Sequence, residues 1–199
     1  NFLSGYSISL NGDGTIVAIG SPKYSNVTAI EGSVRVFKYN GSDWIQLGNN
    51  IDGRSPNIWS GWSVDLNLDG NIVAIGSRYF VSVGYLRVYR FNGSNWIKLG
   101  DDIYGETSGD QAGYSASLHS DGSVVAIGSI RNDNYRGYVH IYKYDGYNWY
   151  KMGNNIVGES TGDQSGISLS LSGDGTMIAI GANKNDGNGI DSGHVRLYG

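Results

Sequence analysis

The stretch Gly5-Tyr6-Ser7-Ile8-Ser9-Leu10-Asn11-Gly12-Asp13-Gly14-Thr15-Ile16-Val17-Ala18-Ile19-Gly20 decides the fold, because it returns three more times along the chain. The further copies are residues 61–76, 113–128 and 166–181, at intervals of 52 to 56 residues. Each copy keeps a glycine, a serine two residues later, a leucine, an Asp-Gly turn and an Ala-Ile-Gly ending. Self-similarity at such a period indicates a solenoid, a propeller or an array of repeats.

Each repeat has the pattern of four short strands joined by tight turns. In the first repeat, residues 6–10 and 33–39 alternate with the period of two that is typical of a strand, and residues 15–19 are a buried, β-branched run. Asn-Gly and Asp-Gly pairs supply the hairpin turns, since these residues tolerate positive φ. Trp44, Trp96 and Trp149 open the fourth strand of the first three repeats. Four strands in about 50 residues are the pattern of a β-propeller blade.

We therefore predict an all-β, propeller-type repeat fold with four blades of four antiparallel strands, the fourth blade lacking its outer strand. The whole chain, residues 1–199, is one repeat domain, with blades expected at residues 5–53, 61–105, 113–158 and 166–199. The tryptophans are expected to wedge between neighbouring blades, where a large flat side chain buries the most area.

The fourth repeat ends without a Trp-bearing strand, so the edge of its third strand is expected to be open for pairing with another chain. The residues of that edge are Val195, Arg196, Leu197 and Tyr198. A ring of four blades closed by this chain alone is the alternative. The sequence begins at Asn1 without a signal-peptide pattern, which indicates a processed product or a segment of a longer repeat protein.

Composition excludes several classes of protein. The chain has 32 Gly, 15 Tyr and 5 Trp among 199 residues, which fits many turns between apolar strands and neither collagen nor a disordered chain. A net charge of −4 without a basic stripe argues against nucleic acid as a partner. No apolar run approaches the roughly 20 residues of a membrane helix. The absence of Cys removes disulfides, thiolate metal sites and Cys nucleophiles.

Three short motifs resemble the FG-GAP repeat of integrin α-subunit β-propellers. They are Gly5-x-Ser7-Ile8, then Ile19-Gly20-Ser21-Pro22, and then Gly32-x-Val34-x-Val36-Phe37, with Ile180-Gly181-Ala182 in the fourth copy. The resemblance covers essentially the whole chain and implies an extracellular location with adhesive and recognition roles. The Phe of the FG pair is absent, because Ser4, Ser60, Ala112 and Ser165 stand before the repeated glycines.

The resemblance also implies calcium loops, and here the chain departs from the family. The first connection of each repeat is a short hairpin whose single Asp cannot supply the roughly 6–8 oxygens that Ca²⁺ takes, so these aspartates are interpreted as turn formers. The most ligand-like loop is residues 183–191. Its weak candidates for a calcium site are Asn185, Asp186, Asn188 and Asp191, although a turn cluster of Gly, Asn and Asp is the favoured interpretation. No other cofactor is indicated.

No catalytic set can be nominated. His119, His140 and His194 occupy different positions of the repeat, and a surface or rim role is expected for all three. No Gly-x-Ser-x-Gly elbow precedes a helix. The acidic connectors 106–110 and 159–163 are interpreted as solvated turns. An enzyme with its site at the propeller axis is the third hypothesis, and it would require clustered carboxylates in a deep axial pocket.

Three Asn-x-Ser/Thr sequons lie in expected turns or loops, at Asn26, Asn40 and Asn92, and are candidate glycosylation sites. The leading hypothesis is a non-catalytic module of the cell surface or extracellular space, acting as a structural or adhesive unit and compatible with a surface layer or filament. Its expected partners are other protein chains, including copies of itself by strand addition or blade stacking, and glycans. The alternative is a lectin-like module that binds carbohydrate or another small ligand through the loops between strands two and three, with Tyr79 and Tyr135 as contacts.

Overall fold

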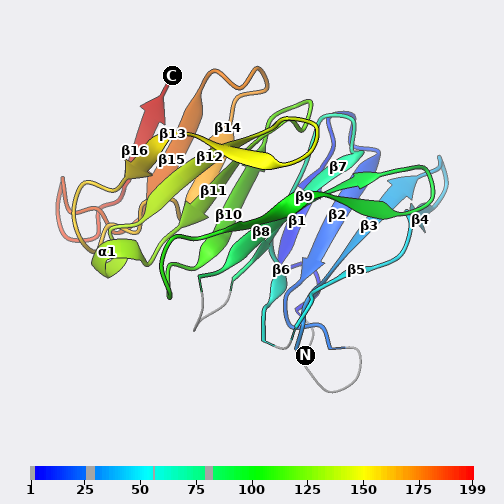
Figure 1. Ribbon diagram of the computed structural model, residues 1–199, viewed down its shortest axis with the longest axis horizontal. Helices are drawn as coiled ribbons and strands as arrows, with labels where there is room; N and C mark the ends of the chain where they lie inside the picture. The colour runs from blue at the N-terminus through cyan, green and yellow to red at the C-terminus, as the bar shows by residue number, and fades with distance from the viewer. Residues whose placement is uncertain (1–2, 26–29, 56, 79–82) are drawn as a thin grey trace.

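The computed structural model describes residues 3–25, 30–55, 57–78 and 83–199, and it folds them into four antiparallel sheets, here called blades 1 to 4 in chain order (Figure 1). Blade 1 consists of β1 (Ser7–Leu10), β2 (Ile16–Ser21), β3 (Ser33–Tyr39), β4 (Trp44–Gln46) and β5 (Ile51–Asp52). Blade 2 consists of β6 (Ser60–Leu66), β7 (Ile72–Ser77), β8 (Tyr85–Phe91) and β9 (Trp96–Tyr104).

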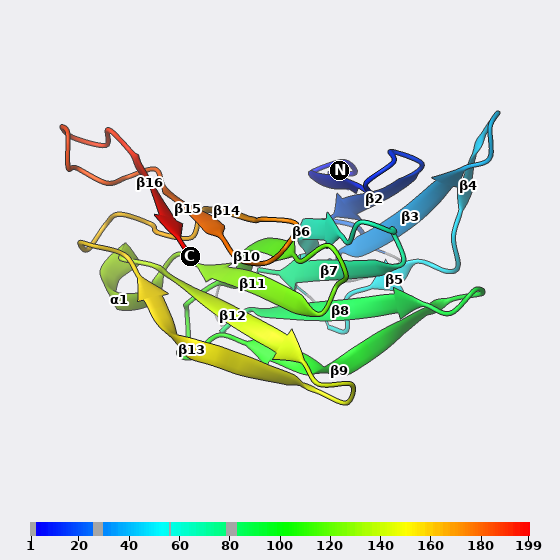
Figure 2. The same ribbon diagram turned by 90° about the horizontal axis from the view of Figure 1, so that it is seen from above.

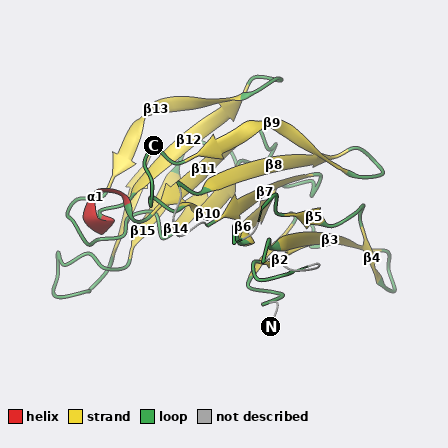
Figure 3. Cartoon of the chain, turned by 60° about the horizontal axis from the view of Figure 1, so that its bottom comes forward, coloured by secondary structure: helices red, strands yellow, loops and turns green. Residues whose placement is uncertain are grey.

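Blades 3 and 4 repeat the same meander. Blade 3 consists of β10 (Ala112–Leu118), β11 (Val124–Ser129), β12 (Tyr138–Tyr144) and β13 (Trp149–Val157). Blade 4 consists of β14 (Ser168–Leu171), β15 (Ile178–Ala182) and β16 (His194–Tyr198). The propeller-type fold is therefore confirmed, including the fourth blade with three strands. Figure 3 shows strands and loops throughout, with the short α1 (Asn132–Tyr135) between β11 and β12.

Side chains of the first hairpin close the turn as its composition predicts. The Asp13 carboxylate accepts hydrogen bonds from the amide and the hydroxyl of Thr15, at 2.9 and 2.6 Å. The Asn11 amide oxygen accepts from the amide of Ile16 at 2.8 Å, and Gly14 has φ +73°. Asp13 is therefore a turn former.

The outer strands extend beyond the repeated glycine. The sequence marks where they begin, at the tryptophans, but not where they end, and β9 and β13 continue past Gly100 and Gly153 to Tyr104 and Val157. A β-bulge interrupts each pairing, after which the connector pairs again with the third strand. In blade 1 the outer strand is divided into two short strands, β4 and β5, and both pair with β3. The repeated glycine is visible in the sequence, but no sequence pattern shows that the outer strand pairs again with the third strand after it.

The apolar core lies between blades rather than inside any one of them. One cluster joins Ala18 and Val36 of blade 1 to Val64 and Trp96 of blade 2. A second cluster joins blade 2 to blade 3, and a third joins blade 3 to blade 4. Since a single sheet cannot bury both of its faces, each blade depends on its neighbours for its stability.

The blades form an open arc. The inner strands β1, β6, β10 and β14 follow one another across its centre, and blades 1 and 4 form its two ends (Figure 2). Ile8 on β1 is 68% exposed, whereas Val64 at the same place on β6 is 8% exposed. A ring closed by blade 4 would cover Ile8, so the described residues do not form the closed four-bladed ring.

Candidate functional site

The repeated serine and glycine hold neighbouring blades together. The Ser7 hydroxyl of blade 1 donates to the carbonyl oxygen of Gly61 in blade 2 at 2.9 Å. Ser63 makes the same bond to Gly113 at 2.9 Å. The third copy of this contact joins Ser115 to Gly166 at 2.6 Å. The Gly-x-Ser motif is therefore a junction between repeats, which the sequence pattern alone did not reveal.

A second set of bonds ties each inner strand to the next. The amide of Leu66 donates to the hydroxyl oxygen of Ser9 at 3.0 Å, and the amide of Leu171 donates to that of Ser117 at 3.0 Å. In the middle junction the acceptor is Asp65, whose carboxylate receives the amide of Leu118 at 2.7 Å. Burial raises the pKa of Asp65, although these hydrogen bonds oppose the rise.

The glycine that ends each second strand allows this close approach. A Cβ atom on Gly20 would lie 2.3 Å from the carbonyl oxygen of Gly61, and one on Gly76 would lie 2.2 Å from that of Gly113. On Gly181 the nearest atom would be the hydroxyl oxygen of Ser168, within its own blade. The glycine of the Ala-Ile-Gly ending is thus required wherever another blade follows.

The tryptophans confirm the predicted wedge where a blade precedes them. The Trp96 indole nitrogen donates to the carbonyl oxygen of Leu47 at 2.9 Å, and Trp149 donates to Leu99 at 2.9 Å. Trp96 and Trp149 are 7% and 8% exposed. Trp44 has no blade in front of it in the described structure and is 46% exposed.

The two ends of the arc expose the faces that the inner junctions bury. Blade 1 exposes Ile8 and Leu10, which correspond to the buried Val64 and Leu66 of blade 2. Blade 4 exposes Val195 and Leu197, which correspond to residues that are buried in blade 1. The first pair forms what we call the leading face, and the second pair forms the trailing face.

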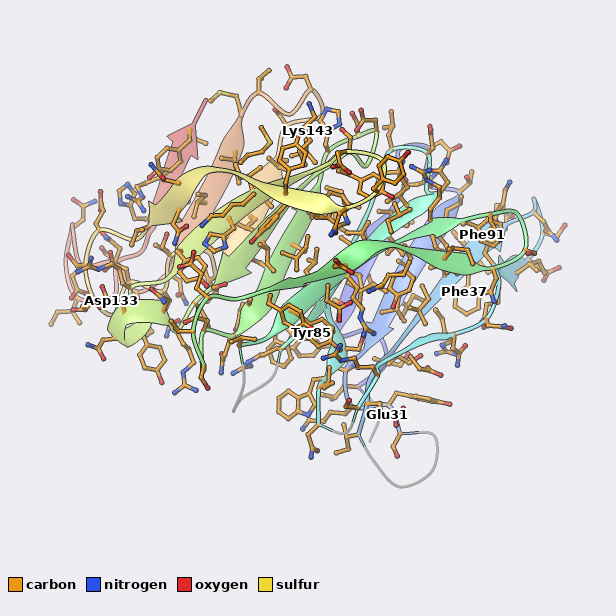
Figure 4. All side chains as sticks on the ribbon, in the orientation of Figure 1. Glu31, Phe37, Tyr85, Phe91, Asp133 and Lys143 are labelled. Carbon is orange, nitrogen blue, oxygen red and sulfur yellow. The ribbon has the colours of Figure 1, made fainter. Side chains whose placement is uncertain are left out.

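A pocket of about 260 Å³ lies at the rim, between elements of blades 2, 3 and 4. Two arginines, two tyrosines and two glutamines line it: Arg78, Arg131, Tyr114, Tyr135, Gln111 and Gln164. Asp133, labelled in Figure 4, marks the α1 segment that carries Tyr135 at the edge of the molecule. We call this hollow the rim pocket.

The structure does not gather the weak calcium candidates into one set of ligands. The Asn185 amide donates to the carboxylate of Asp163 at 3.0 Å, so its nitrogen faces that acid. Asp186 accepts from the amide of Asp191, and Asp191 pairs with Lys184 at 2.8 Å. Asn188 is exposed. Among the described residues, no group of three or more His, Cys, Asp or Glu side chains is placed to hold a metal ion.

The other predicted positions are mostly on the surface. Asn40 and Asn92 are exposed, and each accepts hydrogen bonds from the backbone of its own turn. Asn26 and Tyr79 lie outside the described residues. The edge residues Val195–Tyr198 belong to β16, which pairs with β15 on one side. In the described part of the chain, no named strand pairs with its other side.

A surface role for every histidine is wrong for His140, which is 1% exposed. Its ring stacks on Tyr138 at 4.3 Å, and its Nε2 atom lies 3.3 Å from Glu106 without the geometry of a hydrogen bond. Burial, together with the charge of Lys151, lowers its pKa to about 4. The sequence concealed this burial because half-buried arginines occupy the same place in the other blades.

The aspartates of the two acidic connectors are buried, so the solvated-turn interpretation is wrong for them. Asp110 and Asp163 are 1% and 3% exposed. Asp110 accepts hydrogen bonds from the amide of Thr107 at 2.7 Å and the hydroxyl of Tyr138 at 2.6 Å. Burial alone would raise the pKa of Asp110, but the hydrogen bonds outweigh it and hold that pKa below its usual value.

The junction glycines and serines recur in blade 4, and this part of the chain matches a known repeat family. Residues 158–198 match the FG-GAP repeat. The FG-GAP match covers blade 4, and blades 1 to 3 share its Gly-x-Ser and Ala-Ile-Gly junction residues. No curated protein matches the sequence significantly. No helix in the described ranges is long and apolar enough to cross a membrane.

Solved structures share the fold of this chain at low sequence identity. A protein from Bacteroides uniformis named as a candidate 6-phosphogluconolactonase is 9% identical with a TM-score of 0.61, over 96% of this chain and 49% of that one. TolB from Acinetobacter baumannii is 13% identical with a TM-score of 0.55, over 96% and 42%. The Dos1 propeller is 14% identical with a TM-score of 0.54, over 96% and 43%. The chain spans less than half the length of each.

Proposed function

We propose that this chain is a non-catalytic β-propeller module that acts as a structural or adhesive unit, and that it works by continuing its blade-to-blade junction onto a further copy of itself. The observation that carries this proposal is the pair of open faces at the ends of the arc. The leading face of blade 1 and the trailing face of blade 4 are the two halves of a junction that the chain already forms three times.

The chemistry of the two faces is complementary as well as apolar. On the trailing side, the Ser168 hydroxyl occupies the place of the donors Ser7, Ser63 and Ser115. On the leading side, Gly5 occupies the place of the acceptor glycines, and a Cβ atom on it would meet nothing within 4 Å. A second copy that brought Gly5 to Ser168 would therefore form a fourth junction of the same kind.

Two arcs joined in this way give a propeller of about twice the length, which agrees with the similar structures, since each is more than twice as long as the region it shares with this chain. Closure at both ends yields a ring, and a mismatch in curvature yields an open filament. The unpaired side of β16 is the place where a strand from another chain would complete blade 4. The exposed sequons Asn40 and Asn92 and the FG-GAP repeat support an extracellular or cell-surface location.

A non-catalytic role is supported by what lines the hollow of about 360 Å³ between the inner strands. Its one carboxylate, Asp65, is engaged with the Ser9 hydroxyl and the Leu118 amide. A general acid–base pair needs two titratable groups with opposed pKa shifts. The described lining offers one such group, and it already serves the junction.

The experiment measures mass by sedimentation equilibrium with a matched set of variants. The wild-type chain is expected to associate as concentration rises, and Ile8→Asp on the leading face and Leu197→Asp on the trailing face are each expected to remain monomeric. Ile190→Asp is the control, because Ile190 is 92% exposed in a loop outside both faces. A wild-type chain that stays monomeric, or association that survives both face variants, would contradict the proposal.

Mixing the two face variants tests the direction of the contact. The Ile8→Asp chain keeps an intact trailing face, and the Leu197→Asp chain keeps an intact leading face. An equimolar mixture is therefore expected to form a dimer, although each variant alone does not. Failure of the mixture to associate would contradict contact between opposite faces, and self-association of either variant alone would show that like faces meet.

A further inference from the structure

We propose that the rim pocket is a binding site for a carboxylate-bearing sugar residue. The proposal concerns a different surface from the end faces and is independent of blade association. Arg78 follows β7 of blade 2, and Arg131 follows β11 of blade 3, so neighbouring blades bring two guanidinium groups to one hollow. The described lining residues include no Asp or Glu. A chain with a net charge of −4 thus carries a locally positive hollow.

Arg78 is held in a fixed orientation. Its Nε atom donates to the Gln111 amide oxygen at 3.1 Å, and its guanidinium lies 4.2 Å from the centre of the Trp62 ring and 5.2 Å from that of Tyr114. An arginine held against aromatic rings loses little freedom when it binds. Such a group is pre-organised for the paired hydrogen bonds that guanidinium makes with a carboxylate.

Gln111 adds an unused donor. The side chain is fully buried, and its Nε2 atom has no hydrogen-bond partner in the described part of the chain. Because a buried amide nitrogen without a partner destabilises the folded state, its retention beside the pocket favours a ligand oxygen as the missing acceptor. This unsatisfied group is the observation that separates the rim pocket from an ordinary surface hollow.

The backbone around the pocket is held in a conformation that L residues rarely adopt. Gln111 and Gln164 stand at the same place in blades 3 and 4, two residues before the repeated glycine, and have φ +58° and +56°. Tyr135 has φ +64°, and its carbonyl oxygen accepts from the amide of Gln164 at 2.8 Å. Leu3 and Trp59 have φ +49° and +54° at the same place in blades 1 and 2, so at Gln111 and Gln164 this conformation belongs to the repeat, whereas that of Tyr135 belongs to the α1 segment beside the pocket.

The ring of Tyr135 provides the surface for the sugar itself. It is 40% exposed, and the Arg131 guanidinium lies 4.8 Å from its centre. An exposed ring beside a cation suits a ligand with one flat apolar face and one acidic group. The pocket volume of about 260 Å³ is close to the lower end of small-molecule sites, roughly 300–1,000 Å³, and so fits a single sugar residue rather than a larger ligand.

The test measures affinity by calorimetric or NMR titration with glucuronic acid and N-acetylneuraminic acid, with neutral glucose and inorganic sulfate as comparison ligands. The acidic sugars are expected to bind with Kd of about 1 mM or tighter, and glucose at least about tenfold more weakly. Arg131→Gln is expected to weaken the acidic sugars at least about tenfold. The matched control is Arg136→Gln, five residues further along, whose guanidinium pairs with Asp133 and does not line the pocket.

A second variant separates a sugar site from a simple anion site. Tyr135→Ala is expected to weaken the acidic sugars and to leave sulfate binding unchanged. Sulfate binding as tight as that of the acidic sugars, or equal losses in Arg131→Gln and Arg136→Gln, would overturn the proposal. Absence of binding by both acidic sugars to the folded wild-type chain would overturn it as well.

Discussion

The indole nitrogen of Trp96 donates a hydrogen bond to the carbonyl oxygen of Leu47, 2.9 Å away in the preceding blade. The same bond joins Trp149 to Leu99, so one contact of the outer strand is repeated from blade to blade. Together with the Ser-to-Gly bonds of the inner strand, it ties both the rim and the centre of each junction. The junction, rather than the blade, is therefore the unit that the sequence repeats.

Trp96 should contribute far more to stability than Trp44, although both open an outer strand. Trp96→Ala removes a buried indole and its hydrogen bond, and we expect a loss of about 3–5 kcal/mol in the free energy of unfolding. Trp44→Ala should lose less than about 1 kcal/mol, because its side chain is 46% exposed. Urea denaturation of the dilute, monomeric chain measures both. Equal losses would show that Trp96 owes its burial to its own strand and not to blade 1.

A larger side chain at the centre of a second strand should be tolerated only in blade 4, because Ala18 at the other end of the arc is fully buried. Ala126 is fully buried in the cluster between blades 3 and 4, and Ala126→Leu is expected to destabilise by about 1–3 kcal/mol through overpacking. Ala179 has the same place in blade 4 but is half-buried. Ala179→Leu is the matched control and should change the denaturation midpoint little. An unchanged midpoint for Ala126→Leu would contradict the blade-to-blade packing.

His140 should make the fold sensitive to mild acid. Its pKa is lowered from its ordinary value of 6.5 to about 4 in the folded chain, so the folded state keeps the imidazole neutral while the unfolded state takes up a proton. Stability from this group is full above the unfolded value and is lost as pH falls from about 6.5 towards 4, by roughly 3 kcal/mol in all.

The measurement compares wild type with His140→Gln between pH 7 and pH 5. The variant should lose less stability than the wild type over this range, because its side chain does not titrate. Glu106, Lys151 and Asp110, the charged groups that act on His140, remain in both proteins. Parallel curves for the two proteins would mean that His140 is protonated in the folded state as readily as in the unfolded state.

Removal of calcium should leave the fold intact. In the 183–191 loop, Asp191 is already paired with Lys184, and the Asn185 amide nitrogen donates to Asp163. We therefore expect a chelator to leave the thermal midpoint almost unchanged. An ion that binds only the folded chain stabilises it by mass action, so a fall of many degrees on chelation would show that the loop binds calcium.

Much of the fold follows from short stretches of sequence. The period-two strands, the Asn-Gly and Asp-Gly turns and the recurrence of the repeat predict the strand order and the number of blades, because each depends on residues close together in the chain. The rim pocket could be predicted only in part. The sequence suggested Tyr135 because it lies in a loop between the second and third strands of its repeat. Arg78 and Gln111 come from other segments, and no local sequence pattern shows that they lie beside Tyr135.

The sequence by itself determined the four repeats, the three strands of the last one and the turns between strands, since turn chemistry and side-chain alternation act over a few residues. Only the tertiary structure decided which copies of a repeated residue are buried. Trp44 and Trp96 share one place in the repeat, yet one is exposed and the other is enclosed, because enclosure requires a preceding blade. Burial depends on contact between segments that are distant in the sequence. Such contact encloses His140, whereas Ile8 and Leu197 lie on the end faces of the arc and stay exposed.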